Sequence, residues 1–202
     1  MQRVQPFLPS ASTLIGDRIH RTPIADLLFI EANRTDDFRG FYAELGILPD
    51  LDKVIGRPFV VKQVNHARSE QNVARGFHAE DWDKLITVAH GVCSCVWVDL
   101  RRDSETFGMA VSMALGDGDG SVFGSVYVGR GIGNGYVVST GPADYVYATN
   151  ALYRERDPQF DQAISLFDPE LNVEWPIPRL EMVLSQRDKQ AITLAELQQK
   201  NK

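Results

Sequence analysis

Between residues 84 and 148 the chain alternates short apolar runs with glycine-rich turns, and this alternation is what most constrains the fold. The runs lie at residues 85–89, 92–100, 107–115, 122–128, 136–139 and 145–148. Runs of this length and spacing predict the strands of a β-sandwich or β-barrel. In the second run, Cys93, Cys95 and Trp97 alternate with valines, so both faces of that strand are apolar. We therefore expect this strand to be covered on both sides.

The bulk properties of the chain exclude several classes of protein. A length of 202 residues and an ordinary composition predict one domain with a substantial core. The net charge of −6 gives no reason to expect binding to bulk nucleic acid or to an anionic membrane. Local clusters of arginine still leave an anionic small molecule open as a ligand.

The N-terminal residues and the cysteines predict a cytoplasmic protein. Residues 1–12 lack the pattern of a signal peptide, and no segment is long and apolar enough to cross a bilayer. Cys93 and Cys95 are too close in sequence for a good disulfide ring, so we expect two buried thiols in a reducing compartment. A lone pair of cysteines also offers too few ligands for zinc.

The stretch from Gln63 to His78 carries an unusual density of amides, histidines and arginines between apolar flanks. Polar groups this dense, leading into a strand, are more typical of a pocket wall than of a solvated face. We interpret His78 as a candidate catalytic base. Such a base needs a carboxylate that holds its tautomer and stabilises its charged form, and spacing alone does not select one.

Two glycine-rich segments suggest ligand loops, but their context disfavours both. Residues 129–135 are followed by a predicted strand, whereas a dinucleotide-binding loop leads into a helix. A glycine-rich β-turn crowded against a pocket is the favoured interpretation. Residues 116–120, Gly-Asp-Gly-Asp-Gly, are too short for a calcium loop and lack its distal glutamate.

The two ends of the chain differ from its centre. We expect a strand at residues 24–32, a polar turn at residues 33–37, a loop with at most one helical turn at residues 45–58, and a strand at residues 59–64. Near the C-terminus, Ser185 is the predicted N-cap of a helix that runs through Leu197.

Seven blocks of sequence resemble the dTDP-4-dehydrorhamnose 3,5-epimerase family, and they occur in the family's order. One of them is Arg75-Gly76-Phe77-His78, and another is the Glu-Trp-Pro ending at residues 174–176. The blocks lie at residues 37–41, 75–78, 83–86, 98–108, 143–147, 168–176 and 184–188. No single block is decisive, but the ordered set is highly specific and covers residues 30–190.

The resemblance implies an all-β fold, a cupin-like double-stranded β-helix (jelly roll) with short peripheral helices and a C-terminal helix. It implies one epimerase domain over residues 1–202. Its expected parts are N-terminal strands at 24–44, a jelly-roll core at about 59–150, and a C-terminal extension and helix at 168–200. It also implies a homodimer.

The implied reaction is epimerisation of a nucleoside-diphosphate 4-keto-6-deoxy sugar at C3 and C5. A proton is abstracted alpha to the keto group and returned on the opposite face. The resemblance implies no metal and no redox cofactor.

Residue roles are also carried over from the resemblance. His78 matches the base, Asp188 its carboxylate partner, Tyr147 the proton donor on the other face, and Lys84 the residue near the keto oxygen. The positions that match substrate contacts are Arg39, Glu44, Gln63, Asn65, Arg75 and, at the diphosphate, Arg187.

Two positions fit the family pattern less well. Asp161 lies near a family glutamate, across a difference in local length. Asn134 replaces a family histidine that contacts substrate; asparagine can form hydrogen bonds but does not titrate. The exact sugar and the number of inverted centres therefore stay open.

Three alternatives are compatible with parts of the pattern. A mono-epimerase would act at C3 or C5 only. A non-catalytic sugar-nucleotide binding cupin would predict damage to His78, Asp188, Lys84 or Tyr147, and all four are present. A metal-dependent cupin dioxygenase would predict a cluster of three histidines, but only His66 and His78 lie in range.

Overall fold

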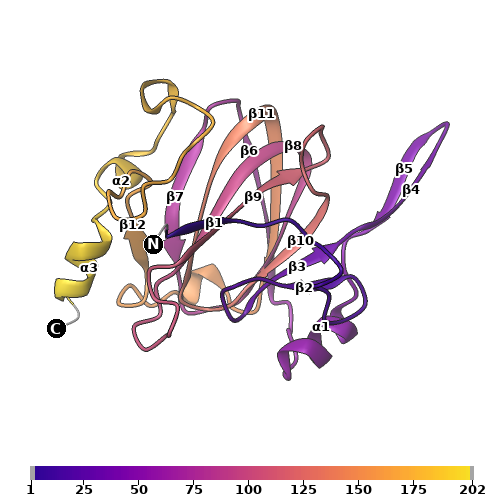
Figure 1. The fold of residues 1–202 in the computed structure, drawn as a ribbon, viewed down its shortest axis with the longest axis horizontal. Helices are drawn as coiled ribbons and strands as arrows, with labels where there is room; N and C mark the ends of the chain where they lie inside the picture. The colour runs from indigo at the N-terminus through magenta and orange to yellow at the C-terminus, as the bar shows by residue number, and fades with distance from the viewer. Residues whose placement is uncertain (1–2, 201–202) are drawn as a thin grey trace.

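The structure, a computed structural model that describes residues 3–200, is built mainly from β-strands, with few and short helices (Figure 1). The strands of the main body are β1 (Val4–Pro6), β2 (Ile19–Arg21), β3 (Leu27–Glu31), β6 (Gln63–Ser69), β7 (Ala74–Ala79), β8 (Lys84–Asp99), β9 (Ala110–Gly116), β10 (Gly124–Val128), β11 (Ile132–Thr149) and β12 (Gln162–Ile164). The predicted all-β class is confirmed.

Strands β8 and β11 are long enough to belong to two sheets at once. The first half of β8 and the second half of β11 pair with each other and continue the order β2-β3-β10-β8-β11-β6. The second half of β8 and the first half of β11 give the order β1-β9-β8-β11-β7-β12. Strands that pass from one sheet to the other form the corners of a sandwich. The result is the jelly roll implied by the resemblance.

The two corners lie where the sequence predicts turns. Gly91, inside β8, has a φ of 78°, and the register of β11 shifts between Val138 and Tyr145. The expectation of separate strands at residues 85–89 and 92–100, and at 136–139 and 145–148, is therefore wrong. Glycine and proline bend these strands at the corners, while pairing continues on both sides of each bend.

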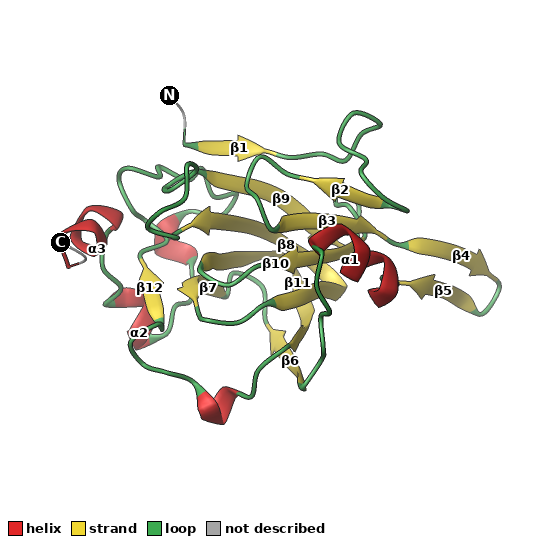
Figure 2. Cartoon of the chain, turned by 90° about the horizontal axis from the view of Figure 1, so that it is seen from below, coloured by secondary structure: helices red, strands yellow, loops and turns green. Residues whose placement is uncertain are grey.

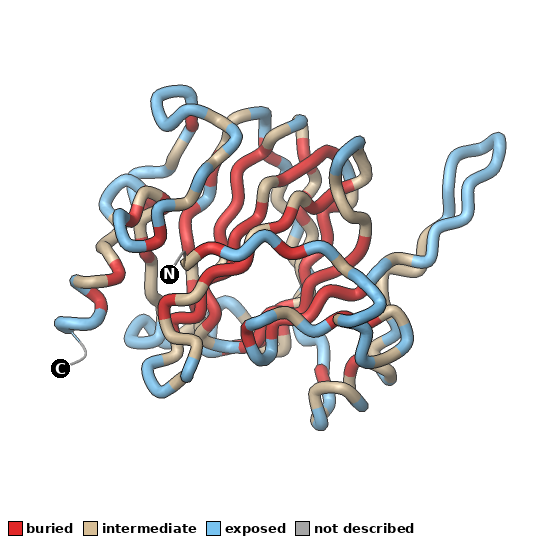
Figure 3. The backbone as a smooth tube through the Cα atoms, viewed as in Figure 1, coloured by how far each residue is buried: buried red, intermediate tan, exposed pale blue. Residues whose placement is uncertain are grey.

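Buried residues are concentrated on the strands of the two sheets (Figure 3). Their apolar side chains form three clusters, one between the sheets and one outside each of them. Cys93, Cys95 and Trp97 lie in the cluster between the sheets. Val96 and Val98 lie in the outer cluster, which the C-terminal segment (residues 164–197) covers. This confirms the prediction that the strand is covered on both sides. The third cluster lies between α1 (Leu48–Ile55) and the strands β2, β3 and β10.

Two strands leave the body and form an arm (Figure 1). Strands β4 (Asn33–Asp37) and β5 (Gly40–Glu44) pair only with each other, and their residues are largely exposed. The prediction of a polar turn at residues 33–37 is wrong, since these residues form strand β4. A strand with neither face buried needs no apolar alternation, so its sequence resembles a turn.

The helices are short and peripheral (Figure 2). Helix α1 replaces the loop expected at residues 45–58, because Pro49 lies in its first turn and Gly56 ends it with a φ of 70°. These residues flank the helix rather than interrupt it. Single-turn 3₁₀ segments lie at Tyr153–Glu155 and Arg179–Glu181. Within the described residues, no helix is long and apolar enough to span a membrane.

The single C-terminal helix expected from Ser185 through Leu197 is two helices, α2 (Gln186–Lys189) and α3 (Leu194–Lys200). Ser185 is the N-cap of α2, as predicted. The helix breaks because Ile192 pairs with Ile164 in an isolated β-bridge.

Both ends of the described chain pack on the same sheet. Strand β1 pairs with β9, and residues of β1 and α3 belong to one outer cluster. We therefore propose that the chain forms one domain.

Replacing Gly91 with Ala is expected to destabilise the fold by about 3 kcal/mol, through left-handed strain and overlap with fixed backbone. A Cβ atom there would lie 2.7 Å from the carbonyl oxygen of Thr140. The matched control is Gly56→Ala, where φ is 70° but no atom lies within 4 Å; its expected cost is about 1 kcal/mol. Urea unfolding measures the loss of stability in both variants. Equal losses would contradict the conclusion that backbone atoms crowd Gly91 at the corner.

Candidate functional site

A cavity of about 410 Å³ opens between the two sheets, and most of the predicted site residues line it. Its polar lining comes from both sheets and from the C-terminal segment. The lining residues are Gln63, Asn65, Ala67, Arg75, His78, Glu80, Lys84, Ile86, Asn134, Tyr136, Tyr145, Tyr147, Tyr153 and Arg187. Residues predicted from six separate parts of the sequence therefore meet in one place.

A bulge brings Arg75 and His78 to the same cavity. The two residues are three apart, so on a regular strand they would face opposite sides of the sheet. On β11, however, Asn134 pairs with His78 and Tyr136 pairs with Arg75, so three steps on β7 match two on β11. The extra residue on β7 turns both side chains inward.

Asp188 contacts His78 but is not among the residues that line the cavity. The Nε2 atom of His78 is 2.7 Å from Oδ1 of Asp188, and the hydroxyl of Ser185 donates to Oδ2 at 2.7 Å. Asp188 is in the first turn of α2, and its carboxylate lies next to Gly76 of β7. A Cβ atom on Gly76 would lie 3.1 Å from Oδ1 of Asp188, so glycine leaves room for the carboxylate.

The charge of Asp188 determines the tautomer of His78. Burial by itself would raise the pKa of Asp188, but hydrogen bonds from His78 and Ser185 outweigh it and lower the pKa below 3.8. An ionised carboxylate only accepts hydrogen bonds, so Nε2 of His78 carries the proton. The lone pair of neutral His78 is then on Nδ1, which is the atom able to accept a proton.

Lys84 and Tyr147 are two further ionisable side chains that line the cavity. Lys84 is almost fully buried and forms an ion pair with Glu80, whose carboxylate also lines the cavity. Burial raises the pKa of Tyr147, and the nearby charge of Glu80 raises it further. Tyr147 therefore keeps its proton at neutral pH and can act as an acid.

Gln63, Asn65 and Arg187, three further predicted substrate contacts, also line the cavity. Gln63 donates to Asn65 at 2.6 Å, since the two residues alternate on the same face of β6. The same alternation turns His66 outward to Asp144. The strand expected at residues 59–64 instead begins at Gln63, and it ends at Ser69. Arg187 forms an ion pair with Asp161 at 2.6 Å, so Asp161 contacts a residue of the cavity lining.

Arg39 and Glu44 lie outside this cavity, on the arm. Arg39 pairs with Asp37 at 2.5 Å, and Glu44 accepts from Asn33 at 2.9 Å. Neither residue lines the cavity. The structure of one chain therefore separates these two residues from the other predicted contacts.

Sequence reasoning missed four polar residues of the lining: Glu80, Tyr136, Tyr145 and Tyr153. Tyr145 could have been found, because it precedes Tyr147 by two residues and alternate residues of a strand share a face. Glu80 could have been found in the same way, because it follows His78 by two residues, directly after the end of β7. Tyr136 carried no such signal, since a bulge determines where it points.

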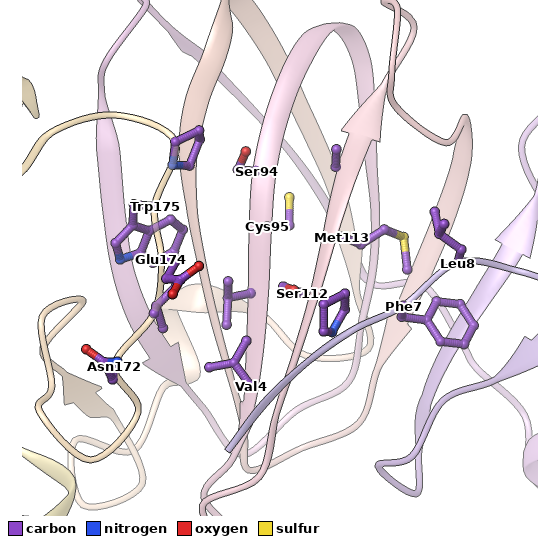
Figure 4. Close-up of a pocket in the computed structure, with 15 residues that line it drawn as sticks. Val4, Phe7, Leu8, Ser94, Cys95, Ser112, Met113, Asn172, Glu174 and Trp175 are labelled. Carbon is purple, nitrogen blue, oxygen red and sulfur yellow. The ribbon is translucent and has the colours of Figure 1, made fainter. Parts of the chain in front are cut away.

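A second cavity, of about 440 Å³, lies on the outer face of β8 and β9 under the C-terminal segment (Figure 4). Its lining is mainly apolar, and Glu174 is the one charged side chain among its described lining residues. It offers no pair of acid and base groups. The first cavity is therefore the candidate active site.

The residues that line the cavity carry more positive than negative groups, although the whole chain is acidic. Arg75, Lys84 and Arg187 line the cavity together with one carboxylate, that of Glu80. Such a lining suits an anionic ligand. In residues 3–200, no three His, Cys, Asp or Glu side chains gather in an arrangement that could hold a metal ion.

Comparisons with known proteins agree on one family. The family model for dTDP-4-dehydrorhamnose 3,5-epimerase matches residues 21–196. The enzyme of that name from Escherichia coli is 32% identical over 181 residues, which are 88% of this chain and 94% of that one.

Two solved structures share the fold over most of both chains. NovW, a 4-keto-6-deoxy sugar epimerase from Streptomyces spheroides, superposes with a TM-score of 0.83 at 29% identity and covers 96% of this chain and 94% of its own. The epimerase of Legionella pneumophila, solved with dTDP-4-keto-L-rhamnose, gives a TM-score of 0.77 at 31% identity and covers 89% and 95%.

Replacing Asp188 with Asn is expected to remove an acid-sensitive part of the protein's stability. Because the pKa of Asp188 is lowered from 3.8 in the folded state, its ionised form stabilises the protein above that pH. This stabilisation is lost as the pH falls through the lower, folded-state pKa. The difference in free energy of unfolding between wild type and Asp188→Asn should therefore shrink below pH 3.8.

Urea unfolding at a series of pH values measures this difference. Asp119→Asn is the matched control, since it removes an exposed carboxylate from a loop. A difference between wild type and Asp188→Asn that stays constant from neutral pH into the acid range would contradict the lowered pKa.

Proposed function

This chain belongs to the dTDP-4-dehydrorhamnose 3,5-epimerase family, and we propose that it epimerises a nucleoside-diphosphate 4-keto-6-deoxy sugar at C3 and C5. It is thus an isomerase of deoxysugar biosynthesis. The observation that carries the proposal is the placement of a histidine–aspartate pair and a protonated tyrosine on different sheets that enclose one cavity.

The chemistry begins with a proton next to a ketone. The 4-keto group acidifies the protons on C3 and C5, and Nδ1 of His78 takes one of them. The electron pair of the C–H bond moves into an enolate whose negative oxygen lies near the ammonium group of Lys84. Electrostatic stabilisation of this kind is strong in a cavity that excludes water.

Inversion requires that the proton return on the other face of the sugar ring. His78 is on β7 in one sheet, whereas Tyr147 is on the half of β11 that pairs with β6 in the facing sheet. A ring between the sheets would therefore have the base on one side and the acid on the other. Tyr147 gives its proton to the carbon, and solvent then resets the tyrosine and the histidine.

The diphosphate is the anionic part of the proposed substrate, and two arginines of the cavity lining supply its counter-charges. Arg75 and Arg187 are both positioned at the cavity, and guanidinium groups pair well with phosphate oxygens. Arg187 would exchange its present partner, Asp161, for the substrate. The amides of Gln63 and Asn65 offer further hydrogen bonds.

We also propose a homodimer in which each arm completes the site of the partner subunit. The arm carries Phe38, 98% exposed, and Tyr42, 71% exposed. A two-stranded hairpin is marginally stable by itself, so burial of these aromatic side chains against a second copy would stabilise it. This arrangement would bring Arg39 and Glu44 to a cavity, which they do not reach within one chain.

A cytoplasmic location completes the proposal. It is supported by the free, buried thiols of Cys93 and Cys95, since disulfides mark oxidising compartments.

The reaction is tested with dTDP-4-keto-6-deoxyglucose in deuterated water, with NMR signals of C3 and C5 as the readout. We expect deuterium at both carbons and inversion at both. Deuterium at one carbon only would identify a mono-epimerase, and deuterium at neither would refute epimerisation of this sugar.

His78→Asn is expected to slow exchange by at least about a hundredfold, because it removes the general base. The matched control is His66→Asn, on the outward face of β6, which should exchange at the wild-type rate. Tyr147→Phe should retain deuterium exchange but lose inversion, since the base alone returns deuterium to the face it came from. Equal loss of exchange and inversion would remove Tyr147 from the acid role.

The exchange of arms is tested by mixing two variants. Arg39→Ala has an intact cavity and a defective arm, whereas His78→Asn has an intact arm and a defective cavity. If arms cross between subunits, refolding the two together restores activity in mixed dimers, because one cavity then receives an intact arm. Activity no higher than the sum of the separate variants would mean that Arg39 acts within its own chain or not at all.

A further inference from the structure

Tyr145 makes a contact inside the cavity that the proposed reaction leaves unused. Its hydroxyl group donates a hydrogen bond to Oδ1 of Asn134 at 2.9 Å. Both residues line the cavity, and Tyr145 is only 3% exposed. A buried phenol with a single partner suggests that this contact has a definite role.

The ring of Tyr145 is held by its neighbours and has little freedom to turn. It stacks on Tyr136 with ring centroids 4.2 Å apart and an angle of 12° between the planes. Tyr147 approaches its edge at 6.3 Å and 63°. Burial raises the pKa of Tyr145 well above its ordinary value, so the hydroxyl keeps its proton and donates it.

In the structure, the amide of Asn134 turns its oxygen toward this donor. An amide can present either its oxygen or its NH₂ group to a ligand, and the two orientations are close in shape. Because Oδ1 accepts from Tyr145, Nδ2 must point elsewhere. Among the described residues, no group accepts a hydrogen bond from Nδ2 of Asn134.

The NH₂ group therefore remains available beside the proposed base. Asn134 on β11 is paired directly with His78 on β7. Paired residues of antiparallel strands point to the same face, with Cβ atoms about 5 Å apart. A donor in this position meets an oxygen of the sugar near the carbon that loses its proton.

We propose that Tyr145 is a positioning residue that holds the Asn134 amide with its NH₂ group toward an oxygen of the bound sugar. This inference rests on the proposed function, since it deepens the recognition of the same substrate. Tyr145 acts only through Asn134. The pair thus selects a sugar with a hydrogen-bond acceptor, a hydroxyl or keto oxygen, beside the reacting carbon.

A double-mutant cycle tests this dependence. Tyr145→Phe should raise KM about tenfold with a smaller change in kcat, as expected for loss of one oriented hydrogen bond. In an Asn134→Ala background, the same change should have an effect of less than about twofold, because nothing is left to orient. Equal losses in both backgrounds would overturn the proposal and assign Tyr145 a packing role.

Two further variants serve as controls for the proposed role of Tyr145. Tyr127→Phe removes another buried phenol hydroxyl, one that accepts from Arg57 outside the cavity, and it should leave KM unchanged. Asn134→Asp replaces the NH₂ donor with an acceptor and needs no change at Tyr145. Its KM should rise at least as much as that of Asn134→Ala, and a wild-type KM would overturn the proposal.

The same double-mutant cycle is repeated for ligand binding. Calorimetry measures the Kd of each variant for dTDP-glucose, a sugar nucleotide that lacks the keto group. If the wild-type protein catalyses no exchange at C3 or C5, the proposed function fails, while the binding cycle still decides the role of Tyr145. Coupling between Tyr145 and Asn134 in binding supports the inference, and strictly additive losses overturn it.

Discussion

The pairing of β8 with β11 over nearly their whole lengths is the constraint on which the rest of the structure depends. Each strand begins in one sheet and ends in the other, so the two sheets must face one another. The cavity between them follows from this topology. A shift of one residue in the register of β11 would turn Tyr147 to the opposite face and remove it from the cavity.

The C-terminal segment is held mainly by apolar packing. Its leucines, Leu166, Leu171, Leu194 and Leu197, are buried against the outer face of the second sheet. Burial of one such side chain stabilises a fold by about 2 kcal/mol, compared with about 1 kcal/mol for a hydrogen bond. Packing of these leucines therefore places Asp188 next to His78, and the contact between the two residues adds a smaller stabilisation of the C-terminal segment.

Much of the fold and of the candidate site could be predicted. The alternation of Cys93, Cys95 and Trp97 with valines correctly indicated a strand between two apolar layers. The N-cap at Ser185 was also correct, because capping is a local interaction. Two of the errors have a shared cause: the continuous strand β11 and the break at Ile192 depend on pairing with residues distant in sequence. The strand Asn33–Asp37 was missed for another reason, since it pairs with the neighbouring strand β5 but buries neither face.

The sequence by itself determined which chemical groups are present and, through its ordered blocks of resemblance, the family to which the chain belongs. Only the tertiary structure brought Asp188 to within 2.7 Å of His78, turned Arg75 inward at a bulge, and joined Tyr145 to Asn134. These outcomes depend on strand register, bulges and packing across the sheets. Such interactions join residues far apart in the chain, and a local pattern of residues does not encode them.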